Sequence, residues 1–366
     1  MRRSIKWLLA LVLVPGVSSA QQPSTDIENT RYGGTAAQFL TLPGDARGAA
    51  LGGAYAALVS DVASMFWNPA GLALIDGRQA LFSYTSYVAD TRHIWAGVAT
   101  PLRDGDWALG VSVTNFGFND QPVYTEEMPD GTGETYDVSS TAIGLTVAFN
   151  FSDRFSAGIT PKLVTENLAG LTGATFALDF GTNYHTELAG RPIRASFAVL
   201  NLGPSFSVSG PSLNVGIEPG EDSQNVDNQP ARLRTTPFEP PIQFRVGVAY
   251  DVLAAADQRL TLLSDFWQPN DSDPGASFAA EFSRTFGPVT AALRGSYAYL
   301  ADNAAADVGD FVFDSQAEND AALDGLAFGG GLNWQIAEGR QLSVDYAYRH
   351  LGVLSGVNMF SIRLTW

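Results

Sequence analysis

Side chains that could bind a metal ion or act as a general base are few in this chain and lie far apart. The three histidines are His93, His185 and His350, each near the end of a separate candidate strand, without the close spacing of a metal site. We interpret them as solvated histidines or histidines at a rim. No serine stands beside a base in an arrangement that suggests a nucleophile. The sequence thus predicts no enzyme, no catalytic residue, no metal site and no cofactor.

The chain has no cysteine, which excludes thiol chemistry, iron–sulfur clusters and disulfides. Its one glycine triplet, Gly329 to Gly331, lies within a candidate strand and not at a turn from strand to helix, so it is not a phosphate loop. We expect these glycines to let another segment pack closely against the strand.

The formal net charge of −17 argues against nucleic acid as a partner.

Two irregular stretches, 118–137 and 300–324, are rich in carboxylates. These carboxylates are Asp120, Glu126, Glu127, Asp130, Glu134 and Asp137 in the first stretch, and Asp302, Asp307, Asp310, Asp314, Glu318, Asp320 and Asp324 in the second. Calcium bridging or recognition of a basic partner is one interpretation, but EF-hand-like spacing is absent and we favour a hydrated surface. Phe311 to Phe313 forms an apolar island that could fold over a mouth or touch a partner.

Residues 1–20 have the features of a secretory signal peptide. Arg2, Arg3 and Lys6 precede an apolar run over residues 7–14, and small residues lead to a cleavage site after Ala20. The apolar run is too short to span a bilayer as a helix. We therefore predict export of the chain.

From residue 78 onward, apolar and polar residues alternate in segments of about ten residues. Near the end of the chain, the even positions from Phe360 to Trp366 are apolar and the odd positions from Ser361 to Thr365 are polar. Successive side chains of a strand point to opposite faces, and about ten residues is the length of a tilted strand that crosses the hydrocarbon layer. We predict fourteen strands, at 78–88, 92–102, 106–117, 138–150, 153–167, 172–184, 191–203, 241–251, 258–267, 276–285, 287–299, 325–336, 340–350 and 357–366.

The connections support a membrane barrel. The long stretches 118–137, 204–240 and 300–324 all fall on one side of the predicted sheet, and the other side has short turns. A soluble β-sandwich or propeller also alternates, but the signal peptide, strand length and loop asymmetry together favour the barrel. We predict an all-β protein, a 14-stranded antiparallel transmembrane β-barrel over residues 78–366. It would lie in the bacterial outer membrane, in contact with its lipid, with both termini on the periplasmic side.

Residues 21–77 do not alternate. Small residues dominate from Ala46 to Ser60, which indicates a tight helix or paired turns, and Asn68-Pro69 is typical of a helix start. The segment is too short for an ordinary domain and leads into the first strand, so we predict an N-terminal plug, or hatch, inside the lumen. A periplasmic extension packed beneath the barrel is the alternative.

Two stretches of this segment, 42–55 with Asp-Ala-Arg-Gly and 60–72 with Trp-Asn-Pro-Ala-Gly, resemble the N-terminal signature of the PorV/PorQ family. That family belongs to the FadL-like group of fourteen-stranded barrels with an N-terminal hatch. The candidate binding residues carried by this signature are Asp45, Arg47, Trp67, Asn68, Pro69, Ala70 and Gly71.

The resemblance implies a role in type IX secretion, in which PorV-like members collect proteins with a C-terminal signal domain and pass them to the attachment machinery. Expected partners are then these secreted proteins and other secretion components. FadL-like members instead admit hydrophobic small molecules through a lateral opening, and a purely structural barrel is a third hypothesis. Trp67 favours PorV/PorQ, whereas Asn-Pro-Ala is common to both branches.

Overall fold

The structure is a computed structural model that describes residues 33–102, 105–217, 229–300, 324–354 and 356–366. The signal peptide, residues 21–32 and the apolar island from Phe311 to Phe313 therefore lie outside the described residues.

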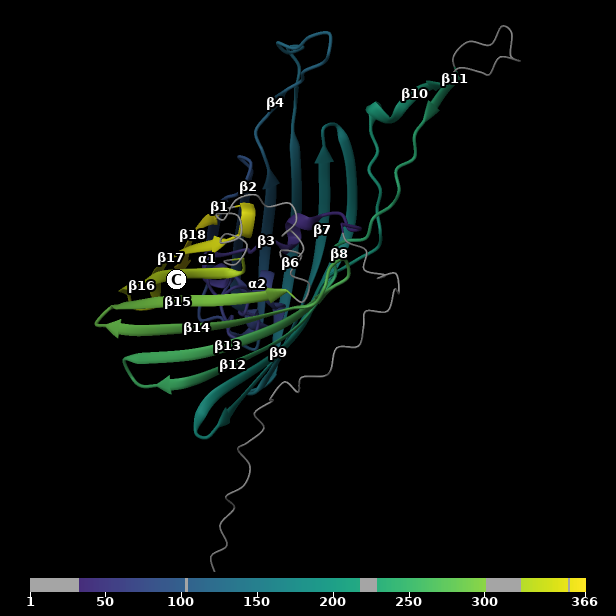
Figure 1. Ribbon diagram of the computed structural model, residues 1–366. Helices are drawn as coiled ribbons and strands as arrows, with labels where there is room; N and C mark the ends of the chain where they lie inside the picture. Colours follow the sequence, from purple (N-terminus) through teal and green to yellow (C-terminus); the bar gives the residue numbers. More distant parts are fainter. Residues whose placement is uncertain (1–32, 103–104, 218–228, 301–323, 355) are drawn as a thin grey trace, which may run out of the picture. The chain divides into compact units, whose positions relative to one another are not determined.

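Fourteen strands of the described chain form a closed antiparallel barrel, which β1 and β18 close by pairing with each other (Figure 1). They are β1 (Gln79–Ser86), β2 (Arg92–Leu102), β3 (Trp107–Gly117), β6 (Val138–Ser152), β7 (Phe155–Leu168), β8 (Leu171–Leu188), β9 (Arg191–Leu202), β12 (Gln243–Ala254), β13 (Gln258–Pro269), β14 (Gly275–Phe286), β15 (Val289–Leu300), β16 (Leu326–Ala337), β17 (Arg340–His350) and β18 (Gly356–Thr365). The predicted fold and strand count are confirmed. The largest difference in bounds is at β8, which continues to Leu188 instead of ending at residue 184.

The two faces of the barrel wall follow the alternation of the sequence. In β18, Phe360 and Ile362 are about half exposed (54% and 51%), whereas Ser361 between them is 3% exposed. The exposed side of the wall is thus apolar and the buried side is polar or small. This is the arrangement of a barrel whose outside meets lipid.

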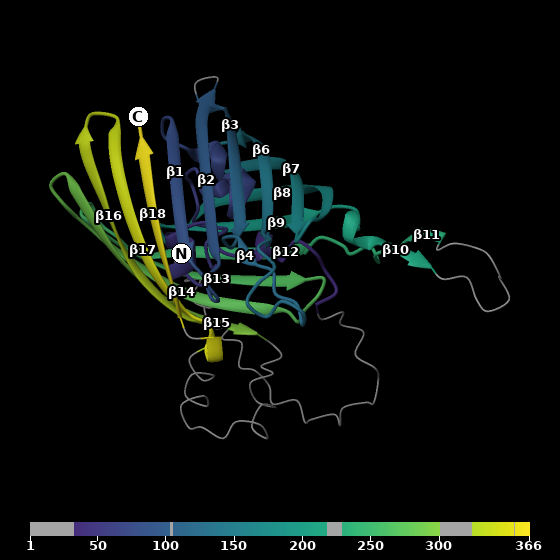
Figure 2. The ribbon, with the colours of Figure 1, turned by 90° about the horizontal axis from the view of Figure 1, so that it is seen from above.

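The two ends of the barrel differ in their connections. One end, here the long-loop end, has the hairpins β4 (Gln121–Pro122) with β5 (Thr135–Tyr136) and β10 (Asn214–Ile217) with β11 (Gln229–Arg232), and the 3-10 helices η4 (Pro211–Leu213) and η7 (Gly352–Leu354). The other, the short-turn end, has tight connections such as the one between β16 and β17. The C-terminus lies at this short-turn end (Figure 2).

Residues 33–78, here the hatch, pass through the inside of the barrel from one end to the other. At the long-loop end, the Thr35 hydroxyl donates to the Asp271 carboxylate across 2.5 Å. At the short-turn end, the Arg78 N–H donates to the Trp366 carbonyl across 2.9 Å. The first and last described residues therefore lie at opposite ends of the barrel. The predicted periplasmic position of the N-terminus falls on residues outside the described part of the chain.

The hatch contains four short helices: η1 (Gln38–Thr41), α1 (Ala46–Ala50), α2 (Ser64–Trp67) and η2 (Pro69–Leu74). Figure 1 shows α1 and α2 within the ring of strands. Helices this short are not stable alone and depend on packing. Asn68 does start a helix with Pro69 at its first position, as predicted, but this helix is 3-10. Within the described residues, no helix has the length and apolar character needed to cross a membrane.

Small residues on the wall let the hatch pack closely. Leu51, Tyr55 and Leu72 of the hatch belong to a buried apolar cluster whose wall members include several alanines. A Cβ on Gly329 would lie only 2.7 Å from the Ala50 Cβ of α1. The expectation that the glycine triplet allows another segment to pack closely is therefore confirmed for Gly329, whereas Gly330 and Gly331 lie against neighbouring strands of the wall.

Candidate functional site

Asp45 holds the first turn of the hatch signature. As the N-cap of α1, its carboxylate accepts hydrogen bonds from the N–H groups of Arg47 (3.1 Å) and Gly48 (3.3 Å). It also accepts a bond from the indole Nε1 of Trp67, across 2.6 Å. Asp45 thus joins the start of α1 to the end of α2, although Asp45 and Trp67 are 22 positions apart in the sequence.

The glycine of Asp-Ala-Arg-Gly makes room for this tryptophan. A Cβ on Gly48 would come within 2.4 Å of the Trp67 indole carbons, so no larger residue fits without movement of the ring. The edges of Tyr55 and Phe66 complete the aromatic packing, with ring centroids 6.1 Å and 5.0 Å from that of Trp67.

Arg47 connects the hatch to the barrel wall. Its Nε and Nη2 donate to the two carboxylate oxygens of Glu281 in β14, across 2.9 Å and 2.7 Å. Glu281 also accepts from Arg294 Nε of β15, across 2.6 Å, and Arg294 Nη1 donates to Asp345 of β17, across 2.6 Å. A chain of charge-assisted hydrogen bonds therefore links α1 to three strands.

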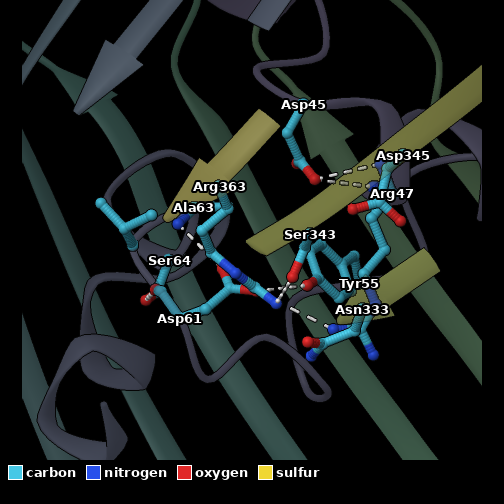
Figure 3. A network of polar contacts seen from close by, with 12 residues as sticks. Asp45, Arg47, Tyr55, Asp61, Ala63, Ser64, Asn333, Ser343, Asp345 and Arg363 are labelled. Carbon is cyan, nitrogen blue, oxygen red and sulfur yellow. Dashed lines mark hydrogen bonds and ion pairs between the residues drawn. The ribbon is translucent and has the colours of Figure 1, made fainter. Parts of the chain in front are cut away.

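Asp61 provides the second ionic link between the hatch and the wall. Its carboxylate accepts hydrogen bonds from Arg363 of β18 and from the Ala63 N–H (2.9 Å), and it lies 3.8 Å from Arg47 Nη1. Arg363 also donates to the Ser343 hydroxyl of β17, across 3.1 Å (Figure 3). We call this set the anchor network; its members are Arg47, Asp61, Glu281, Arg294, Asp345 and Arg363.

Arg245 of β12 holds the hatch from another side. Its Nη2 donates to the Gly53 carbonyl (2.5 Å) and to the Asp265 carboxylate of β13 (2.8 Å). The same guanidinium lies over the Trp67 ring, 5.3 Å from its centroid, where it gains a cation–π attraction. The turn after α1 is therefore fixed to β12.

Asn68 binds two parts of the hatch and the wall at once. Its Oδ1 accepts from the Ala70 N–H (3.2 Å) and so caps η2. Its Nδ2 donates to the carbonyls of Ala56 (3.0 Å) and of Thr182 in β8 (3.2 Å). An asparagine has both the acceptor and the two donors that this position requires.

The rest of the Asn-Pro-Ala-Gly element lies against strand glycines and backbone. A Cβ on Gly181 would be 2.0 Å from Asn68 Oδ1, and one on Gly158 would be 2.4 Å from the carbonyl carbon of Pro69. A Cβ on Gly71 would meet the Val59 carbonyl oxygen at 2.3 Å. The Ala70 carbonyl accepts a bond from the Ser156 hydroxyl of β7, across 3.2 Å.

The seven predicted binding residues thus form two groups. Asp45, Arg47 and Trp67 come together around α1, and residues 68–71 contact β7 and β8 separately. Asp45, Trp67 and Asn68 are at most 3% exposed, and the groups they contact belong to this same chain. Binding of an external partner by these residues stays a prediction.

The wall residues of the anchor network were not predicted as site residues. Strand alternation places Glu281, Arg294 and Asp345 on the inner face, but their pairing depends on register. The structure sets Glu281 directly opposite Arg294 in adjacent strands. Asp61 lies in the second stretch of the signature, 60–72, but was not among the predicted binding residues.

Of the two interpretations of the histidines, the structure agrees with a rim position for His93 and His350 and not with a solvated one. They stand at the ends of β2 and β17 and are only 2% and 8% exposed. In the described part of the chain, no group of three or more His, Asp or Glu side chains could hold a metal ion. The carboxylates of loop 118–137 are mostly exposed, as a hydrated surface requires.

Comparisons with known proteins agree with this fold. Residues 25–212 match the sequence model of a family described as type IX secretion system protein PorV. No curated protein sequence matches the chain.

Similar solved structures are the toluene transporters TbuX of Ralstonia pickettii (12% identity, TM-score 0.53) and TodX of Pseudomonas putida (11%, 0.52), and the CymD monoaromatic hydrocarbon channel (11%, 0.51). The similarity covers 88% of this chain in each case, and 98%, 97% and 97% of those chains. At such low identity these structures support the fold alone, that of an outer-membrane β-barrel. Because the family match spans more than half of its 366 residues, the chain belongs to the PorV family of type IX secretion system proteins.

Proposed function

We propose that this chain is a non-catalytic component of type IX secretion that receives secreted proteins at the outer membrane and passes them to the attachment machinery. The observation that carries this proposal is the PorV family match over residues 25–212, which includes the entire hatch signature. The partners would be secreted proteins with a C-terminal signal domain and other secretion components. The long-loop end would face the cell surface and Trp366 the periplasm, in keeping with the usual asymmetry of such barrels.

In this proposal the hatch closes the lumen, and protein partners contact the rim and the loops. The anchor network, Arg245 and Asn68 bond the hatch to strands on different sides of the barrel. A segment held at several points is costly to displace, because each broken buried pair leaves an uncompensated charge. Folded substrates would therefore act from outside the lumen.

Uptake of hydrophobic small molecules is the second candidate function, and the likeness to two toluene transporters favours it. One apolar cavity lies between the hatch and β1, β2, β17 and β18, with Leu42, Val357 and Met359 in its lining. Its volume is about 20 Å³, which is room for roughly one water molecule and not for an aromatic ring. The uptake hypothesis would require this cavity to enlarge.

Affinity purification of the detergent-solubilised, tagged protein tests the proposal. We expect secreted proteins that share a C-terminal domain to be recovered with it, and not with an unrelated tagged barrel from the same membranes. Recovery of equal amounts of these proteins with both barrels would contradict the proposal. A hydrophobic small molecule bound in the purified lumen, without secreted proteins, would favour uptake instead.

A further inference from the structure

A cavity of about 420 Å³ lies beneath the hatch at the short-turn end of the barrel. The hatch contributes residues 57–60 and Leu74 to its lining, and the wall contributes His185, Arg194 and Arg259. Arg47 of the anchor network also reaches it. We call this cavity the vestibule. Arg47 and Arg259 are shared with an adjoining cavity that Arg294 and Arg363 also line.

The charged side chains that line the vestibule are all basic, although the chain as a whole carries −17. Their carboxylate partners lie behind them: the Asp251 side chain is fully buried and holds Arg194 through two bonds of 3.1 Å and 3.2 Å. The Arg259 side chain, by contrast, is 52% exposed. Positive groups therefore face the vestibule and negative groups do not.

Hydrogen-bond donors of Arg259 are left unused in the described chain. Arg259 approaches Asp251 only through Nε, at 3.6 Å, which is too long for a hydrogen bond. The Nη1 and Nη2 groups of Arg259 are therefore available to donate to an anion in the vestibule.

Arginines and carboxylates are equal in number around the two cavities: Arg47, Arg194, Arg259, Arg294 and Arg363 with Asp45, Asp61, Asp251, Glu281 and Asp345. The group that would meet an anion in the vestibule is therefore the half-exposed Arg259, and not an excess of charge. Leu58, Val59 and Leu74 form an apolar wall beside the guanidinium groups.

We propose that the vestibule binds a carboxylate that lies next to a short apolar group. A guanidinium presents parallel N–H groups whose spacing matches a carboxylate, and the apolar hatch residues would cover the adjoining part of the ligand. A small organic acid and the end of a polypeptide share this chemistry. The inference is independent of the secretion role, because it is drawn from the cavity alone, and a loss of binding would leave the affinity purification unaffected.

Calorimetric titration of the mature, detergent-solubilised protein tests this site. The probes are N-acetyl-leucine and N-acetyl-Ala-Ala-Leu, each with its C-terminal amide as the control without a carboxylate. We expect saturable binding of the acids and at least about tenfold weaker binding of the amides, since charge-assisted hydrogen bonds are lost. Equal affinity for both acids would assign the site to a small acid, and tenfold tighter binding of the tripeptide would assign it to a polypeptide end.

Arg259→Gln should weaken acid binding about tenfold or more, and His185→Gln should weaken it less. Arg284→Gln is the matched control, because Arg284 lies at the same end with an equally exposed side chain (52%) but on the outer face beside Phe286. A shift between boiled and unboiled samples in gel electrophoresis verifies that each barrel is folded. No binding of either acid at millimolar concentration, or unchanged binding by folded Arg259→Gln protein, would overturn the proposal.

Discussion

At the scale of single residues, the signature of the hatch works through polar groups that are buried and paired. Asp45 satisfies two backbone N–H groups and an indole, and Asn68 uses its acceptor and its donors together. Arg47 differs because it forms an ion pair with a charged side chain of the wall, Glu281. Its loss should therefore loosen the hatch without unfolding the barrel.

Replacement of Arg47 by leucine tests this role. Glu281 would lose two hydrogen bonds but keep Arg294, so we expect the hatch to be destabilised by about 2–4 kcal/mol. Hydrogen exchange of residues 45–75 measures this directly, and Arg284→Leu serves as the control at an outward position. Unchanged exchange in the hatch would show that Arg47 does not anchor it.

A second residue-scale prediction concerns the strand glycines. In Gly181→Ala, the new methyl group would displace the Asn68 amide, because its carbon would lie 2.0 Å from Oδ1. We expect a loss of about 1–3 kcal/mol in unfolding free energy. Gly295→Ala is the matched strand control, since nothing lies within 4 Å of its added Cβ. Guanidinium titration in lipid vesicles measures both, and equal effects would count against the close contact.

At the scale of elements, the strands and the hatch owe their structure to different causes. A barrel strand follows from alternation that is visible in its own residues, as in β18. The hatch helices are only four to six residues long and owe their shape to the wall around them. The hatch should thus be removable as a unit more readily than any strand.

Deletion of residues 35–77 is therefore expected to leave a barrel with an open lumen. Conductance in planar bilayers should rise well above that of the intact protein, because the inner wall carries polar and charged side chains that hold water. The heat-dependent shift in gel electrophoresis must persist in the deletion variant. A folded deletion variant with unchanged conductance would mean that the hatch does not block the lumen.

The same contrast explains how much could be predicted from the sequence. The fourteen strands, the long-loop end and the helix start at Asn68 follow from local patterns, and the structure agrees with them. The partners of Arg47 could not be predicted, because Glu281 is 234 positions away and only the barrel closure brings it near. The burial of His93 was also not predicted, because it lies near hatch residues such as Leu42 that are distant in the sequence.

At the scale of the whole molecule, the cost of placing a charged residue on the outer face of the wall should depend on how deep that position lies in the membrane. Leu145 lies midway along β6 and Leu188 ends β8 at the short-turn end, and both side chains are exposed on the outer face (46% and 56%). We expect Leu145→Arg to destabilise the barrel by about 2–4 kcal/mol and Leu188→Arg by about 0–1 kcal/mol. Reversible unfolding in vesicles measures both. Equal costs would contradict lipid contact at mid-depth.

The position of the hatch inside the closed barrel can be tested directly by cross-linking, because the natural chain has no cysteine. A Cβ on Gly52 of the hatch would lie 3.7 Å from the Ser277 Cβ of β14, within the range of a disulfide. We predict that Gly52→Cys combined with Ser277→Cys forms an internal disulfide in intact outer membranes. Gly52→Cys combined with Gly295→Cys, on the outer face of β15, should not. Failure of the first pair to cross-link in folded barrels, or cross-linking of the second, would contradict a hatch held against the inner wall.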